Sequence, residues 1–113
     1  MKALAGITII SAVLLAGCGD SQAISNVAIN EEAIKAEVMS GSTAKDFLVT
    51  DDGAIYVGVL DNGNNRDGYA MSVCETVRIN ATGEGSRLVR IIDVAAVSRG
   101  EGFKTLGRLQ CKI

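Results

Sequence analysis

Histidine and proline are both absent from this chain of 113 residues. Histidine is the commonest general base at neutral pH, the commonest metal ligand and a member of the usual catalytic triads. The Gly-x-Ser-x-Gly and Ser-x-x-Lys motifs, the Walker loop and the dinucleotide fingerprint are absent too. We therefore expect a protein that is not an enzyme and that uses no metal and no cofactor.

Aromatic residues and positive charge are scarce. The chain has two Tyr, two Phe and a net charge of −2, whereas nucleic-acid-binding domains are basic and offer aromatic stacking surfaces. No nucleic-acid partner is expected. Residues 19–65 hold two basic and eight acidic residues, and residues 66–113 hold eight basic and five acidic ones. This asymmetry indicates either an ordinary solvated surface or a basic face that meets an acidic partner, and a fold that intermixes the halves would remove it.

The only long apolar run lies at the N-terminus. It follows Lys2, continues from Ala3 to Gly17 without a charge, and stops at Cys18. A membrane span needs about 20 residues, so this run is typical of the apolar region of a cleaved signal peptide. An ordinary signal ends in Ala-x-Ala, whereas this one ends in the tetrapeptide Leu-Ala-Gly-Cys.

Residues 1–18 resemble the signal peptide and lipobox of bacterial lipoproteins, and no family is recognised for the rest of the chain. The resemblance implies that residues 1–17 are removed and that Cys18 receives acyl chains, which anchor the protein in a membrane. In Gram-negative members an aspartate directly after the cysteine favours the inner membrane. Gly19 occupies that position here, so the resemblance implies the periplasmic face of the outer membrane, with the inner membrane as the alternative.

The mature chain is predicted to consist of a lipidated cysteine and tether, residues 18–29, and one small domain, residues 30–113. Two cysteines remain in that domain, Cys74 and Cys111. In an exported domain of this size such a pair predicts a disulfide. Two buried thiols and a bridge to a partner are the alternatives.

Local patterns predict an α+β fold. Residues 29–41 are expected to form a helix capped by Asn30, and residues 54–60 a strand paired with 47–50 through a turn at 51–53. Residues 87–100 and 103–113 are expected to be two antiparallel strands. Asp93 then lies within the first of these strands, where we expect either a half-open face or an arginine partner such as Arg90.

The apolar residues within 67–80 fit both the two-residue period of a strand and the 3.6-residue period of a helix. The helical interpretation, which we prefer, uses Asp67 as the cap and Gly83 as a possible stop. It aligns four side chains on one face: Ala70, Val73, Cys74 and Val77. It predicts two short helices on a three- to four-stranded sheet, with parallel strands at 54–60 and 87–97. The strand interpretation predicts one helix on an antiparallel meander of four to five strands.

The most polar stretch, residues 61–68, is a candidate ligand or partner loop. Its candidate residues are Asp61, Asn65, Arg66 and Asp67. It does not fit a calcium-binding EF-hand loop, because Arg66 replaces the sixth-position glycine and Ser72 the twelfth-position glutamate.

These observations predict a lipid-anchored periplasmic interaction or accessory protein of an envelope complex, in secretion, conjugation or cell-envelope assembly. The partners would be the membrane, through Cys18, and an envelope protein. One alternative is an inhibitor, immunity or exclusion lipoprotein that blocks an incoming enzyme, phage or plasmid. A weaker alternative is a small-ligand sensor that uses the 61–68 loop.

Overall fold

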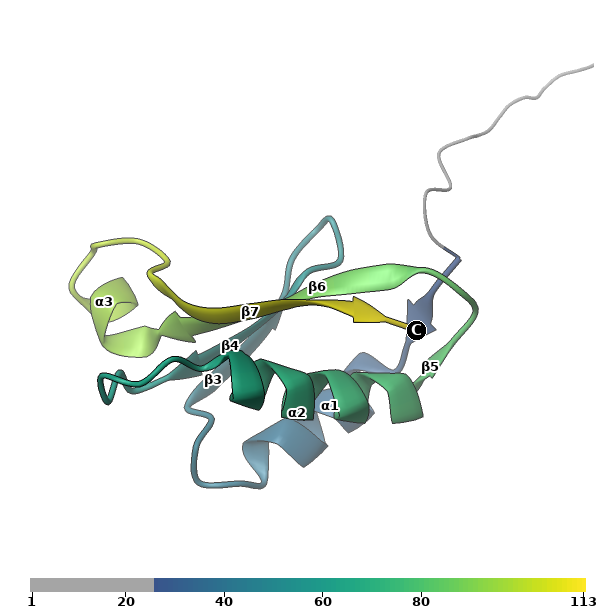
Figure 1. Ribbon diagram of the computed structural model, residues 1–113, viewed down its shortest axis with the longest axis horizontal. Coiled ribbons are helices and arrows are strands. Elements are labelled where there is room, and N and C mark those ends of the chain that lie inside the picture. The colour runs from purple at the N-terminus through teal and green to yellow at the C-terminus, as the bar shows by residue number, and fades with distance from the viewer. Residues whose placement is uncertain (1–25) are drawn as a thin grey trace, which may run out of the picture.

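The protein folds as an α+β domain in which two helices cover one face of a four-stranded sheet (Figure 1). The computed structural model describes residues 26–113, so the predicted signal peptide, Cys18 and residues 19–25 lie outside the described residues. In chain order the elements are β2 (Ala28–Ile29), α1 (Glu31–Met39), β3 (Asp46–Val49), β4 (Ile55–Val59), α2 (Asp67–Ile79), β5 (Ala81–Thr82), β6 (Ser86–Asp93), α3 (Val94–Ser98) and β7 (Thr105–Lys112).

The four-stranded sheet has the order β3-β4-β6-β7. β3 and β4 form an antiparallel hairpin, β4 and β6 are parallel across the α2 connection, and β6 and β7 are antiparallel. The predicted helix at 67–80 and the predicted parallel pair are therefore confirmed, and the meander alternative is wrong. A second sheet of two strands pairs β2 with β5.

The core lies between the sheet and helices α1 and α2. Alternate residues of β4 and β6 point to the helices and are fully buried, as expected for period-two strands: Ile55, Val57, Val59, Val89 and Ile91. α1 packs on β3, whereas α2 packs on β6 and β7. The four residues of the predicted α2 stripe are all buried. None of the helices within residues 26–113 is long and apolar enough to cross a bilayer.

The start of each main helix is set by short polar contacts. Asn30 caps α1 as predicted, because its Oδ1 accepts the N–H of Ala33 at 3.1 Å. The predicted cap of α2 is wrong by one position. Arg66 occupies the cap position without a side-chain cap bond, and Asp67 is the first helical residue.

A disulfide joins α2 to the last strand. Cys74 and Cys111 are bonded, with their Cα atoms 5.5 Å apart, and both residues are buried. The bridge therefore fixes the middle of α2 to β7, which is the pairing that the sequence predicts.

The predicted single strand at 87–100 is wrong after Asp93. β6 ends at Asp93, and residues Val94–Ser98 form the short helix α3. Asp93 is 4% exposed, and its Oδ1 accepts the N–H of Ala95 at 3.0 Å. It therefore caps α3 and neither lies on a half-open face nor pairs with Arg90, since an aspartate at a cap satisfies a helix N–H that has no other partner.

The predicted tether extends too far into the domain. Residues 26–29 are bound to it: β2 pairs with β5, and the N–H of Asn26 donates to the C=O of Glu84 at 3.2 Å. Gly83 makes this contact possible, because its φ is +92° and a Cβ there would lie 2.1 Å from the carbonyl oxygen of Asn26. The folded part thus already includes residues 26–29, which the prediction assigned to the tether.

Candidate interaction site

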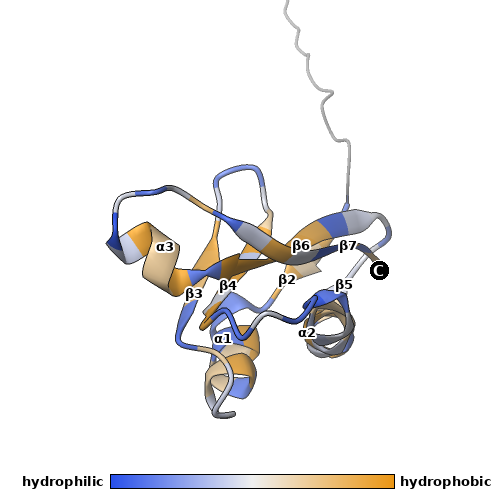
Figure 2. Cartoon of the chain, turned by 60° about the vertical axis from the view of Figure 1, so that its left-hand side comes forward, coloured by the Kyte–Doolittle hydropathy of each residue, from blue (hydrophilic) through white to orange (hydrophobic). Residues whose placement is uncertain are grey.

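The sheet face opposite α1 and α2 is only partly covered. We call it the open face and define it by Leu48 of β3, Tyr56 of β4, Arg90 of β6 and Arg108 of β7, which follow from the strand registers. α3 covers one end of this face, and no other helix of residues 26–113 covers the rest (Figures 1 and 2). Leu48 is 46% exposed there, so the open face offers apolar surface to solvent.

An aromatic and guanidinium cluster stands on the open face beside α3. The rings of Tyr56 and Phe103 meet edge to face, with centroids 5.4 Å apart. Arg90 lies over the Tyr56 ring at 4.8 Å and donates from Nη1 to the Tyr56 hydroxyl at 2.7 Å. Its other nitrogens donate to the hydroxyl of Thr105 and the C=O of Phe103. Phe103 is still 50% exposed, so the cluster is well ordered and accessible, as expected of a protein-binding surface.

The open face keeps positive charge at its β6–β7 side. Arg90 and Arg108 are directly opposite each other across the two strands. No ion pair involves either of them within residues 26–113. Like charges in opposite positions repel, so a partner's carboxylate placed between them would relieve that repulsion.

Within the four-stranded sheet the two halves of the chain lie side by side, whereas β2 crosses to the other half and pairs with β5. β3, β4 and α1 come from the acidic half, whereas α2, β6 and β7 come from the more basic half. The fold therefore preserves the asymmetry predicted from the sequence as a difference between two sides of the molecule.

The predicted 61–68 loop is held by its own hydrogen bonds. Asp61 accepts the N–H of Gly63 at 2.9 Å and lies 3.2 Å from the Lys104 ammonium group. Asn65 accepts the N–H of Asp67 at 2.7 Å. These contacts hold the pKa of Asp61 below its ordinary value, mainly through the bond from Gly63 and then through Lys104.

The other two candidate residues of this loop are also engaged in hydrogen bonds, Asp67 with β7 and Arg66 with the residue that precedes the loop. Asp67 accepts the N–H of Arg108 at 2.9 Å, and Arg66 donates from Nη2 to the C=O of Leu60 at 2.9 Å. The carboxylates of Asp61 and Asp67 thus have different partners and do not converge on one ligand. Among residues 26–113, no group of three or more His, Cys, Asp or Glu side chains is placed to hold a metal ion.

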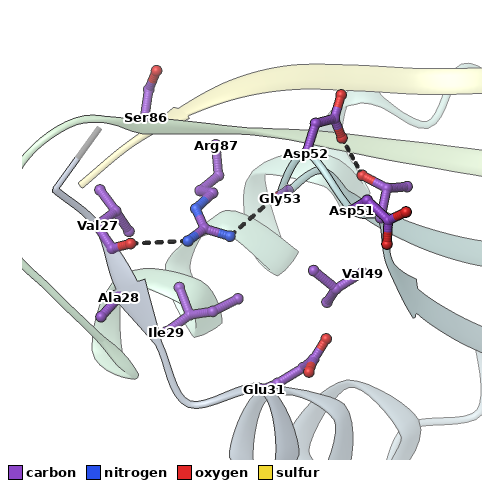
Figure 3. A pocket seen from close by; sticks show the side chains of 11 residues that line it. Val27, Ala28, Ile29, Glu31, Val49, Asp51, Asp52, Gly53, Ser86 and Arg87 are labelled. Carbon is purple, nitrogen blue, oxygen red and sulfur yellow. Dashed lines mark hydrogen bonds between the residues drawn. The ribbon is translucent and has the colours of Figure 1, made fainter. Parts of the chain in front are cut away.

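A hollow of about 710 Å³ lies near the entry of the chain, between β2, the β3–β4 turn and the start of β6 (Figure 3). Arg87 spans it and donates to the C=O of Gly53 at 3.1 Å and of Val27 at 2.9 Å. Both partners are uncharged carbonyl oxygens, and no ion pair within residues 26–113 involves Arg87. Asp52 also lines the hollow, and a hydrogen bond from Thr50 is the main cause that lowers its pKa.

Neither the cluster nor the lining of this hollow was predicted from the sequence. Tyr56 and Arg90 are 34 positions apart, and only the parallel register of β4 and β6 brings them together. Arg87 and Arg90 are three positions apart on one strand, so they point to opposite faces of the sheet. The two-residue period of a strand could have predicted this difference. The bond from Arg87 to Val27 spans 60 positions and has no local signal.

Comparison with family models, with curated proteins and with solved structures found no match to this chain.

Proposed function

We propose that the protein is a lipid-anchored interaction protein of the bacterial envelope, which binds an acidic partner protein on the open face of its sheet. The anchor would be Cys18, on the strength of the lipobox resemblance at residues 1–18. The domain would contribute a rigid surface, because the Cys74–Cys111 bridge and the packed core leave few side chains to order on binding.

The observation that carries this proposal is the cluster of Tyr56, Arg90 and Phe103 beside Arg108. Tyr and Arg are enriched at binding hot spots, where an apolar centre is flanked by groups that pair with the partner. The open face has such a centre, together with two guanidinium groups that lack carboxylate partners within residues 26–113. These features support a partner segment that combines apolar side chains with Asp or Glu.

Site-specific photocrosslinking in the native host tests the surface. p-Benzoylphenylalanine at Phe103 should capture a specific envelope protein, and the same residue at Met71 on α2, which is 60% exposed, should not. Arg108→Glu should weaken the capture, whereas Lys35→Glu on α1 should leave it unchanged. Equal capture from both positions, or none from Phe103, would contradict the proposed surface.

The anchor is tested separately. Cys18→Ser should abolish labelling by palmitate and move the protein from the membrane fraction to the soluble fraction. A palmitate label that persists on this variant would contradict the anchor, whatever the crosslinking shows.

A further inference from the structure

The outer edge of β3 is one of the two edges of the four-stranded sheet, and no strand of residues 26–113 pairs with it. The N–H of Thr50 donates to the C=O of Ala54 at 2.9 Å, so these residues form a hydrogen-bonded pair of the hairpin. Bonded and non-bonded pairs alternate along an antiparallel ladder, which makes Leu48–Tyr56 the next bonded pair. The main-chain groups of Phe47 and Val49 therefore point away from β4.

Only one of these outward groups is occupied within residues 26–113. The N–H of Phe47 donates to the carboxylate of Asp46 at 2.8 Å, which blocks that position. No bond to the N–H or C=O of Val49 from outside β4 is present in the described part of the chain. Val49 thus offers one donor and one acceptor to an incoming strand, the arrangement by which edge strands recruit extended peptides.

A groove leads to this edge. It has a volume of about 320 Å³ and runs between α1 and β3, where Glu31 and Val49 line both this groove and the 710 Å³ hollow beside it. Figure 3 shows Glu31, Val49 and Asp51 around that hollow. The two cavities therefore form a continuous path along β3.

Negative charge dominates the path. Four carboxylates line it, and only two cations do, Lys35 and Arg87. The carboxylates are those of Glu31, Glu32, Asp51 and Asp52. None of the four forms an ion pair within residues 26–113. An occupant with Lys or Arg would neutralise this charge, whereas a second copy of the chain would bring the same carboxylates and be repelled.

We infer that the β3 edge binds an extended, basic segment of a partner polypeptide as a fifth strand. The partner residue opposite Val49 would form the bonded pair with it, and its side chain would point to the helix side, toward Glu31. The next partner residue would lie beside the exposed side chain of Leu48 on the open face. The preferred segment therefore alternates basic and apolar residues. This site shares only Leu48 with the open face and does not include the cluster of Tyr56, Arg90 and Phe103 on which the proposed function depends.

Selection from a displayed library of random linear peptides, against the full chain in detergent micelles, tests this inference. The enriched peptides should alternate Lys or Arg with apolar residues, and their binding should protect the Val49 amide from hydrogen exchange. Val49→Pro removes the outward N–H without removing a bond to β4, and should weaken binding about tenfold. Val49→Thr, which keeps the N–H, is the matched control and should bind as the parent does.

Charge reversal provides the second test. Glu31→Lys combined with Asp51→Lys changes two exposed residues and should abolish binding of the same peptides. This test remains available if the Val49→Pro variant does not fold. Three results would overturn the inference. The enriched peptides could be acidic or show no alternating pattern, peptide binding could stay unchanged in both variants, or the chain could form dimers through β3. The two proposals can fail separately. If p-benzoylphenylalanine at position 103 captures the same partner with and without Val49→Pro while the peptide results contradict this inference, the proposed function still holds.

Discussion

The two edge strands of the four-stranded sheet, β3 and β7, differ in the contacts that their outward main-chain groups make. α2 is attached to β7 at several points: the N–H of Arg66 donates to the C=O of Leu106, Asp67 accepts the N–H of Arg108, and the Cys74–Cys111 bridge joins the two elements in the middle. Near the end of the helix, Arg78 donates from Nε to the C=O of Lys112 at 2.6 Å.

Within residues 26–113 the outer edge of β3 has one comparable contact, in which the N–H of Phe47 donates to the carboxylate of Asp46. Natural sheets block edges that must not pair, because exposed main-chain groups recruit other strands. Contacts to α2 therefore block both ends of the β7 edge, where only the main-chain groups around Gln110 lack a bond in the described part of the chain, whereas on β3 only the Phe47 N–H is blocked.

Removing the disulfide should have the largest effect on this contrast. Cys74→Ala with Cys111→Ala should lower the free energy of unfolding by about 3–4 kcal/mol, because the unfolded chain loses a constraint between residues 37 positions apart. Urea denaturation measures the loss, and each single variant should show nearly all of it. Hydrogen exchange should accelerate in β7 and not in the β3–β4 hairpin; equal acceleration in both would show that the two edges are not independent.

Gly107 tests the contact between β7 and the start of α2. A Cβ at this position would lie 2.3 Å from the carbonyl carbon of Arg66 and 2.7 Å from the backbone nitrogen of Asp67. Gly107→Ala should therefore force the helix from the strand and cost about 1–3 kcal/mol in thermal or urea unfolding. Gly68→Ala is the control in α2, since nothing lies within 4 Å of its Cβ, and it should leave stability unchanged or raise it. Equal losses in both variants would contradict this close contact.

The smallest effect is expected at the ion pair of Asp61 and Lys104, which ties the loop before α2 to the segment before β7. The folded-state pKa of Asp61 is below its ordinary value of 3.8, so the carboxylate stabilises the fold above that value and ceases to do so as the pH falls through the folded-state pKa. Asp61→Asn should thus reduce the fall in stability between about pH 6 and about pH 2. Glu32→Gln is the control, and an identical pH dependence for both variants would contradict the assignment.

Local patterns predicted most of this fold because its main elements are strongly periodic. α2 buries all four residues of its predicted stripe, and β4 alternates as expected. Asp93 was misassigned because the strand criterion weighed the apolar run around it, whereas its carboxylate satisfies an N–H only two residues later. An aspartate followed by Val-Ala-Ala is a cap signal that could have corrected the assignment.

The candidate surfaces were much less predictable than the fold. The cluster depends on the register that sets Tyr56 opposite Arg90, and the path along β3 depends on where α1 packs. The pairing of β2 with β5 has two residues on each side and leaves no periodic signal. Contacts of this kind arise from tertiary packing, which single-sequence patterns do not encode.

The attachment of residues 26–30 also determines how the domain responds to mechanical load. A pull on the chain from its N-terminal side acts first on the contacts of residues 26–30, which include the bonds of Asn26 to Glu84, Arg87 to Val27, and Asn30 to Asn80. These bonds and the short β2–β5 pair must break before tension reaches the four-stranded sheet. Stretching would therefore detach β2 first and uncover the Arg87 guanidinium group while the disulfide-linked core stays folded.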